Sequence, residues 1–126
     1  MERVRRLTPR EVVRQDVEAI AEIYRNLGAP VAEQLVTRAL GELALTMAGI
    51  AEKVNRQETQ DLGRQLVRLR RLAEDIGLSS LATVAGDAGT CLLRGDATAF
   101  AAVWARLMRV AKTSLAQEAG TPDFLT

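Results

Sequence analysis

The chain has 126 residues, of which 48% are hydrophobic and 26% are charged, and these values are typical of one globular domain over residues 1–126. Its 17 basic and 16 acidic residues give a formal net charge of +1. This balance excludes a protein that binds nucleic acid through basic charge spread over its whole surface. Aromatic residues make up only 3% of the chain, and because few residues suit a pleated sheet, the composition favours an all-α fold.

The sequence contains no histidine. It has no imidazole to serve as a nucleophile, a general base or a metal ligand, which leaves lysine and carboxylate mechanisms open. Because no catalytic pair is visible in the sequence, we expect no enzymatic activity, no metal and no cofactor. Cys91 is the single cysteine, which fits a reducing compartment. There is no apolar stretch of about 20 residues and no apolar segment after the basic N-terminus, so we expect a cytoplasmic protein without a membrane span.

The first helix is predicted over residues 9–26. Thr8 can cap it, Pro9 suits its first position, and Glu11 stands three residues after the cap, as in a capping box. Gly28 can adopt the left-handed conformation that ends a helix. The second helix begins near Pro30 and is predicted to be about 25 residues long, with one apolar stripe. The stripe consists of Leu35, Val36, Ala39, Leu43, Met47, Ile50 and Val54.

Three more helices follow a polar interruption at residues 55–58. The third has apolar residues at alternating steps of four and three, the spacing of helices that pack nearly antiparallel. These residues are Leu62, Leu66, Leu69, Ala73 and Ile76. Gly77 ends this helix, Ser79 or Ser80 is expected to cap the fourth, and Asp96 the fifth. The residues expected to face inward on the last two helices are Leu81, Val84, Ala85, Ala88, Cys91 and Leu92, and then Phe100, Val103, Trp104, Leu107, Val110, Ala111 and Leu115.

Connections of about two to six residues make sequential helices lie antiparallel. We therefore predict an up-down four-helix bundle with an additional N-terminal helix. Its core spans residues 9–117, and residues 119–126 are expected to form a flexible tail.

Residues 67–78 read Val-Arg-Leu-Arg-Arg-Leu-Ala-Glu-Asp-Ile-Gly-Leu. This stretch resembles the motif of the histidine-containing phosphotransfer (HPt) domains of bacterial phosphorelays, which is His-x-Leu-Lys-Gly with a later small residue and a glycine ten positions after the histidine. The matching residues are Leu69, Ala73, Ile76 and Gly77. Arg70 replaces the lysine, Arg71 stands at the glycine position, and Val67 replaces the phosphorylated histidine. The resemblance covers residues 15–117.

The resemblance implies an HPt-like fold whose partners are a response-regulator receiver domain or a histidine kinase. A valine side chain has no nitrogen to accept a phosphoryl group. We therefore predict a signalling module that binds such a partner without transferring phosphate. In such proteins the receiver presents an acidic, partly apolar surface around its aspartate pocket.

Val67 lies about 100° around the helix from its buried stripe, so we expect it to be partly exposed. Its neighbours at three and four residues include three arginines. The predicted partner-binding residues are Arg64, Val67, Arg68, Arg70 and Arg71. The same arginines also fit a solvated helix face with local ion pairs.

Two other functions stay open. One is self-association through the second helix, whose small residues Ala39, Gly41, Ala44 and Ala48 allow close approach. The other is contact with nucleic acid through the third helix and the N-terminal arginines, which the scarcity of aromatic residues disfavours. Those N-terminal arginines are Arg3, Arg5, Arg6 and Arg10.

Several residues that suggest chemistry are better explained by structure. Cys91 and Trp104 share stripes with apolar residues, so both are expected in the core. Gly86 and Gly89 lack the preceding strand and the following lysine of a phosphate loop, so we expect them to serve close helix packing. The carboxylates Glu18, Glu22, Glu74 and Asp75 are expected on solvated faces, with no catalytic pair among them.

Overall fold

A computed structural model describes residues 16–118, which form five helices and no strand. The helices are α1 (Val17–Leu27), α2 (Ala29–Asn55), α3 (Leu62–Asp75), α4 (Ser79–Arg94) and α5 (Ala97–Glu118). The predicted all-α fold is thus confirmed for this part of the chain. The predicted capping box at Thr8, the N-terminal arginines and the predicted tail lie outside the described residues.

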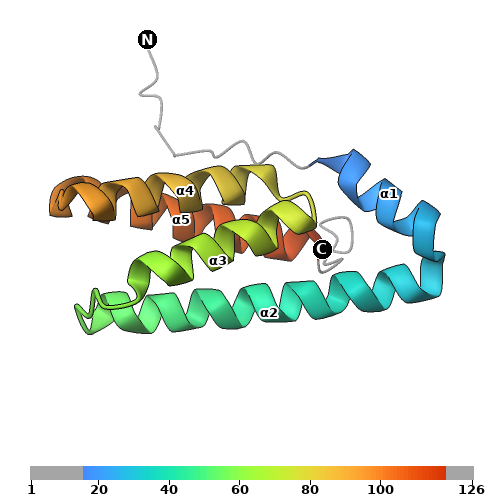
Figure 1. Cartoon of the computed structure of the whole chain (residues 1–126), viewed down its shortest axis with the longest axis horizontal. Coiled ribbons are helices and arrows are strands. Elements are labelled where there is room, and N and C mark those ends of the chain that lie inside the picture. Colours follow the sequence, from blue (N-terminus) through green and yellow to red (C-terminus); the bar gives the residue numbers. More distant parts are fainter. Residues whose placement is uncertain (1–15, 119–126) are drawn as a thin grey trace, which may run out of the picture.

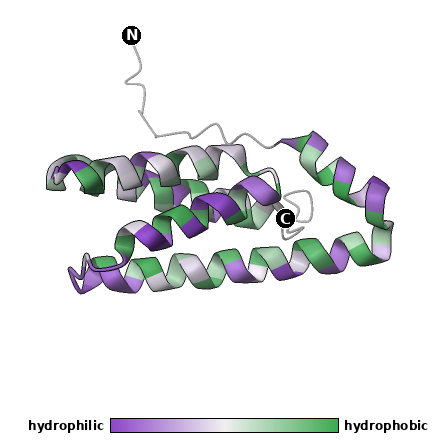
Figure 2. Ribbon diagram, viewed as in Figure 1, coloured by the Kyte–Doolittle hydropathy of each residue, from purple (hydrophilic) through white to green (hydrophobic). Residues whose placement is uncertain are grey.

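From α2 onward, each helix runs opposite in direction to the one before it (Figure 1). The pairs α2 and α3, α3 and α4, and α4 and α5 pack against each other, and α2 also contacts α5. The core lies between these four helices. The residues with the predicted heptad spacing are all buried in it, namely Leu62, Leu66, Leu69 and Ala73 of α3 and its C-cap Ile76. In Figure 2 the ribbon of α3 accordingly alternates between strongly hydrophilic and hydrophobic residues.

The connection between α1 and α2 is a single glycine. The Gly28 N–H donates to the Tyr24 carbonyl at 2.9 Å, and its own carbonyl accepts from the Ala32 N–H at 2.9 Å. Its φ of 82° is positive, as the sequence predicts, but its ψ of 155° is extended rather than left-handed helical. That combination is essentially restricted to glycine. Gly28 therefore ends one helix and begins the next without an intervening loop.

The first described helix begins at Val17, and the predicted start at Pro9 lies outside the described residues. Asp16 is its N-cap, and the carboxylate accepts hydrogen bonds from the backbone N–H groups of Glu18 and Ala19 at 3.1 and 3.3 Å. Such a bond satisfies a backbone donor that has no partner in the first turn. No residue of α1 is fully buried. Its middle is half-buried instead, and Ile20 packs against the core.

The turn between α3 and α4 holds the start of α1. Gly77 has a φ of 74°, and its carbonyl accepts a hydrogen bond from the Asp16 N–H at 2.6 Å. A Cβ atom at this glycine would stand 2.5 Å from the Asp16 carbonyl oxygen. The glycine is therefore needed both for the turn and for the close approach of a second backbone segment.

The predicted caps of the last two helices have different outcomes. Asp96 caps α5 as predicted, since its carboxylate accepts from the Ala99 N–H at 3.0 Å. The prediction of Ser79 or Ser80 as the cap of α4 is wrong, because the N-cap is Leu78 and both serines lie inside the helix. Leu78 is fully buried, so apolar packing determines which residue occupies the cap position. The Ser79 hydroxyl instead donates to the Gly77 carbonyl at 3.4 Å.

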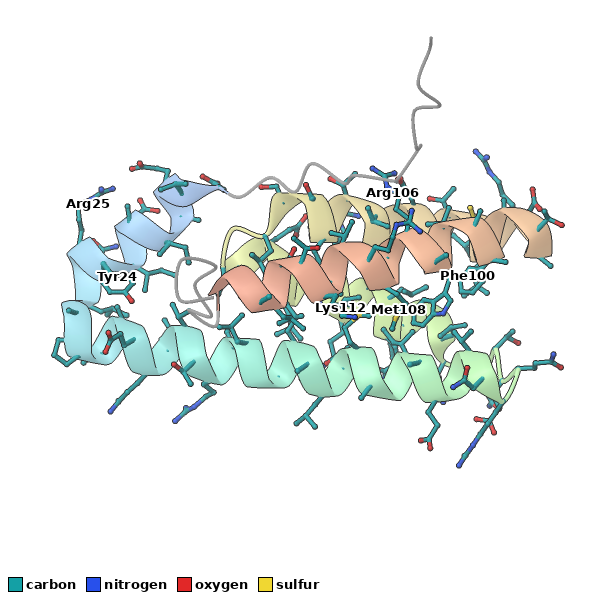
Figure 3. The ribbon with its side chains drawn as sticks, turned by 180° about the vertical axis from the view of Figure 1, so that it is seen from behind. Tyr24, Arg25, Phe100, Arg106, Met108 and Lys112 are labelled. Carbon is teal, nitrogen blue, oxygen red and sulfur yellow. The ribbon has the colours of Figure 1, made fainter. Side chains whose placement is uncertain are left out.

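The predicted inward residues are mostly correct, with exceptions where a helix extends beyond its neighbours. Leu35 is exposed, whereas Ala32 and Val36 in the same part of α2 are buried. This part passes beyond α3 (Figure 1), and its packed side is narrower than the predicted stripe. Cys91 and Trp104 are half-buried rather than central. Trp104 stacks on Phe100 with ring centroids 6.5 Å apart. Viewed from behind, Phe100 lies near the end of the molecule at which α2 finishes (Figure 3).

Within residues 16–118, no helix is both long and apolar enough to cross a membrane.

Candidate partner-binding surface

The outward side of α3 carries the residues that the sequence predicts for partner binding. Arg64, Val67 and Arg71 are spaced three and four residues apart, so they form one stripe opposite the buried residues of the helix. Val67 is 49% exposed, which confirms the exposure expected for it. Arg68 and Arg70 are also exposed and lie on either side of the stripe. We call these five residues the α3 surface.

Three of the four arginines in the α3 surface form ion pairs with exposed carboxylates. The pair within the first turn is long, at 3.9 Å, whereas the other two are at 3.1 and 3.2 Å. In the described part of the chain, Arg71 has no ion pair. The pairs are Arg64 with Asp61, Arg68 with Glu42, and Arg70 with Glu74. Local ion pairs thus involve most of the positive charge of the α3 surface, as expected for a solvated helix face. Arg71 is the arginine of this surface that has no such pair within the described residues.

The arginines do not form a closed ring around Val67. Arg68 points toward α2, where it reaches Glu42. Arg70 points toward α4, where a Cβ at Gly86 would lie 3.8 Å from its side chain. Gly86 is expected from the sequence to allow close packing of two helices. In the structure it instead leaves room for the side chain of Arg70. A Cβ at Gly89 would meet nothing within 4 Å, so the packing interpretation is wrong there.

A polar groove of about 590 Å³ runs between α3 and α4, beside the α3 surface. The Arg70–Glu74 ion pair forms one wall. The other wall is a polar stripe on α4 made of Thr83, Asp87 and Thr90. This stripe is absent from the predicted site residues, although its spacing of four and three residues is visible in the sequence. The Glu42 contact could not be found in this way, since 26 residues separate it from Arg68.

A second groove, of about 770 Å³, lies where the α2–α3 connection meets the α4–α5 turn. Leu62, Leu92 and Phe100 supply much of its apolar lining, and Cys91 opens onto it. The charged residues Lys53, Glu58 and Asp96 also line the groove. The groove therefore combines an apolar floor with charged side chains around it.

Neither groove carries a metal-binding constellation. Across residues 16–118, no three Asp, Glu or Cys side chains are grouped so that they could hold a metal ion. Comparisons of the chain with models of protein families, with curated proteins and with solved structures found no match. The function is therefore inferred from the chemistry of the surface itself.

Proposed function

We propose that the protein is a non-catalytic, HPt-like signalling module of the cytoplasm, which binds a receiver domain or a histidine kinase without transferring phosphate. The observation that carries the proposal is the half-exposed Val67 in the outward stripe of α3, between Arg64 and Arg71. This position corresponds to the phosphorylated histidine in the resemblance described above. A valine there retains a surface for docking but has no nitrogen to accept phosphate.

The proposal treats α2 to α5 as an HPt-like four-helix bundle with α1 as an additional helix. In its support, these four helices alternate in direction (Figure 1), and α2 contacts α5 as well as α3. Such packing fixes α3 on two sides and leaves its third side open. The helix can therefore present side chains to a partner without any rearrangement of the core.

The charges of the α3 surface suit an acidic partner. Exposed ion pairs are worth at most about 1 kcal/mol each, so a partner carboxylate can replace the carboxylates that now contact Arg64 and Arg68. Arg71 needs no such exchange, because no described carboxylate pairs with it. Val67 adds an apolar contact at the centre, as in interfaces with an apolar core and a polar rim.

The test is calorimetric titration of the full chain with receiver domains and kinase domains of bacterial two-component systems. Val67→Glu and Arg71→Glu are each expected to weaken binding at least about tenfold, because the first puts charge into the apolar centre and the second reverses an attractive charge. Val31→Glu and Arg94→Glu are the matched controls, since Val31 is 51% exposed on α2 and Arg94 is exposed on α4.

The proposal is contradicted if no receiver or kinase domain binds, or if the controls weaken binding as much as the α3 variants do. Incubation with a phosphorylated receiver is expected to leave no label on this chain, and stable labelling would also contradict it. Nucleic-acid binding would be recognised differently, by an affinity that falls steeply with salt and ignores base sequence.

A further inference from the structure

The outward side of α2 carries a large apolar side chain with nothing over it. Leu45 is 75% exposed, and the small residues around it are exposed as well, namely Gly41, Ala44, Ala48 and Gly49. A Cβ at Gly41 or Gly49 would meet nothing within 4 Å. Figures 1 and 3 both show α2 along one edge of the molecule, with no other described helix beyond it.

Two opposite charges flank Leu45 on the same stripe. Arg38 lies seven residues before it and Glu52 seven residues after it, which is two helical turns in each direction, or about 10 Å. Arg38 has no ion pair within the described residues, and Glu52 pairs only with the exposed Arg56, at 3.4 Å. The stripe therefore has a positive end, an apolar centre and a negative end.

This pattern is complementary to itself when reversed. Suppose that α2 of a second copy lies antiparallel to α2 of the first, with the two Leu45 side chains in contact. The residue seven positions before Leu45 in one copy then lies opposite the residue seven positions after Leu45 in the other copy. Arg38 then meets Glu52 of the second copy, and Glu52 meets its Arg38. Gly41 stands level with Gly49 of the second copy, so neither helix carries a side chain there that would hold the backbones apart.

We propose that two copies of this chain associate through antiparallel α2 helices, with Leu45 at a two-fold axis and an Arg38–Glu52 ion pair on each side of it. A two-fold interface uses the same patch on both copies, which requires such self-complementarity. The sequence left self-association through the second helix open, and the proposal names the residues and the orientation of that interface. It is independent of receiver binding, because it uses a different helix from the α3 surface.

The test is sedimentation of the full chain between about 1 and about 500 µM, a range suited to an interface smaller than the standard size. We expect a reversible dimer. Leu45→Arg should weaken it at least about tenfold, because two buried leucines are replaced by two like charges. Leu93→Arg is the matched control, since Leu93 is 90% exposed on α4, and it should leave the dimer unchanged.

A charge exchange tests the antiparallel register. Arg38→Glu alone and Glu52→Arg alone should each weaken the dimer, because each places like charges opposite one another. The double variant should return the dissociation constant to within about threefold of the original. Thermal melts of dilute protein check that each variant is folded.

A chain that stays monomeric over the whole range would overturn the proposal, as would a dimer that survives Leu45→Arg. Failure of the double variant to recover would overturn the register, and with it the interface. Association beyond two copies would also contradict it, because a two-fold contact closes on itself. Since the measurement uses this chain alone, its failure says nothing about the α3 surface, and binding of a receiver says nothing about the dimer.

Discussion

Replacing Gly77 by alanine tests how α1 is held. Gly77 and Gly95 both have a positive φ, of 74° and 68°, so alanine at either position costs about 1 kcal/mol of backbone strain. A Cβ at Gly95 would meet nothing, whereas a Cβ at Gly77 would stand 2.5 Å from the Asp16 carbonyl oxygen. Asp16 must then move away and lose its hydrogen bond to the Gly77 carbonyl, which is worth about 1 kcal/mol. We expect Gly77→Ala to cost about 2 to 3 kcal/mol and Gly95→Ala about 1 kcal/mol.

Urea denaturation of both variants, followed by circular dichroism, gives the two free energies of unfolding. Limited proteolysis adds a local readout, because displacement of Asp16 should make α1 more susceptible in Gly77→Ala but not in Gly95→Ala. Equal destabilisation by the two substitutions, with unchanged proteolysis of α1, would refute the role given to the Asp16–Gly77 contact.

Three further predictions concern the core, the caps and the α3 surface. Leu69→Ala should lower the free energy of unfolding by about 2 to 5 kcal/mol, because Leu69 is fully buried. Val67→Ala should change it by less than about 0.5 kcal/mol. Similar values for the two variants would show that α3 is rotated about its axis. Asp96→Ala should cost about 1 kcal/mol through loss of the cap, while Ser79→Ala should cost clearly less, and the reverse order in the same assay would contradict the cap assignments. Binding of a receiver should weaken as salt rises from about 50 to about 300 mM, and titrations that show no salt dependence would argue against the arginines as its contacts.

The helices were predictable because their signals are local. Heptad spacing in α3 identified its buried residues, including Leu66 and Leu69, and the side chain of Asp96 sufficed to locate the start of α5. The exceptions depend on tertiary contacts. Nothing near Leu78 in the sequence shows that it will be buried at a cap position, and the exposure of Leu35 depends on which helices pack against the first part of α2.

The α3 surface was predictable in position but not in detail. Helical geometry alone places Val67 away from the buried residues of α3 and predicts its exposure. The direction of each arginine depends on what faces it from another helix, such as Glu42 for Arg68 and the space over Gly86 for Arg70. The exposure of Leu45 follows from the same geometry, because Val36, Met47 and most of the predicted stripe of α2 lie on the opposite side of the helix.

Docking of a partner on the outward side of α3 can be observed by NMR titration of the ¹⁵N-labelled chain with a receiver domain that binds it. We expect the largest changes in amide chemical shift at Arg64, Val67 and Arg71, with the outward side of α2 little affected. Changes confined to other helices, with those three amides unmoved at saturation, would contradict it.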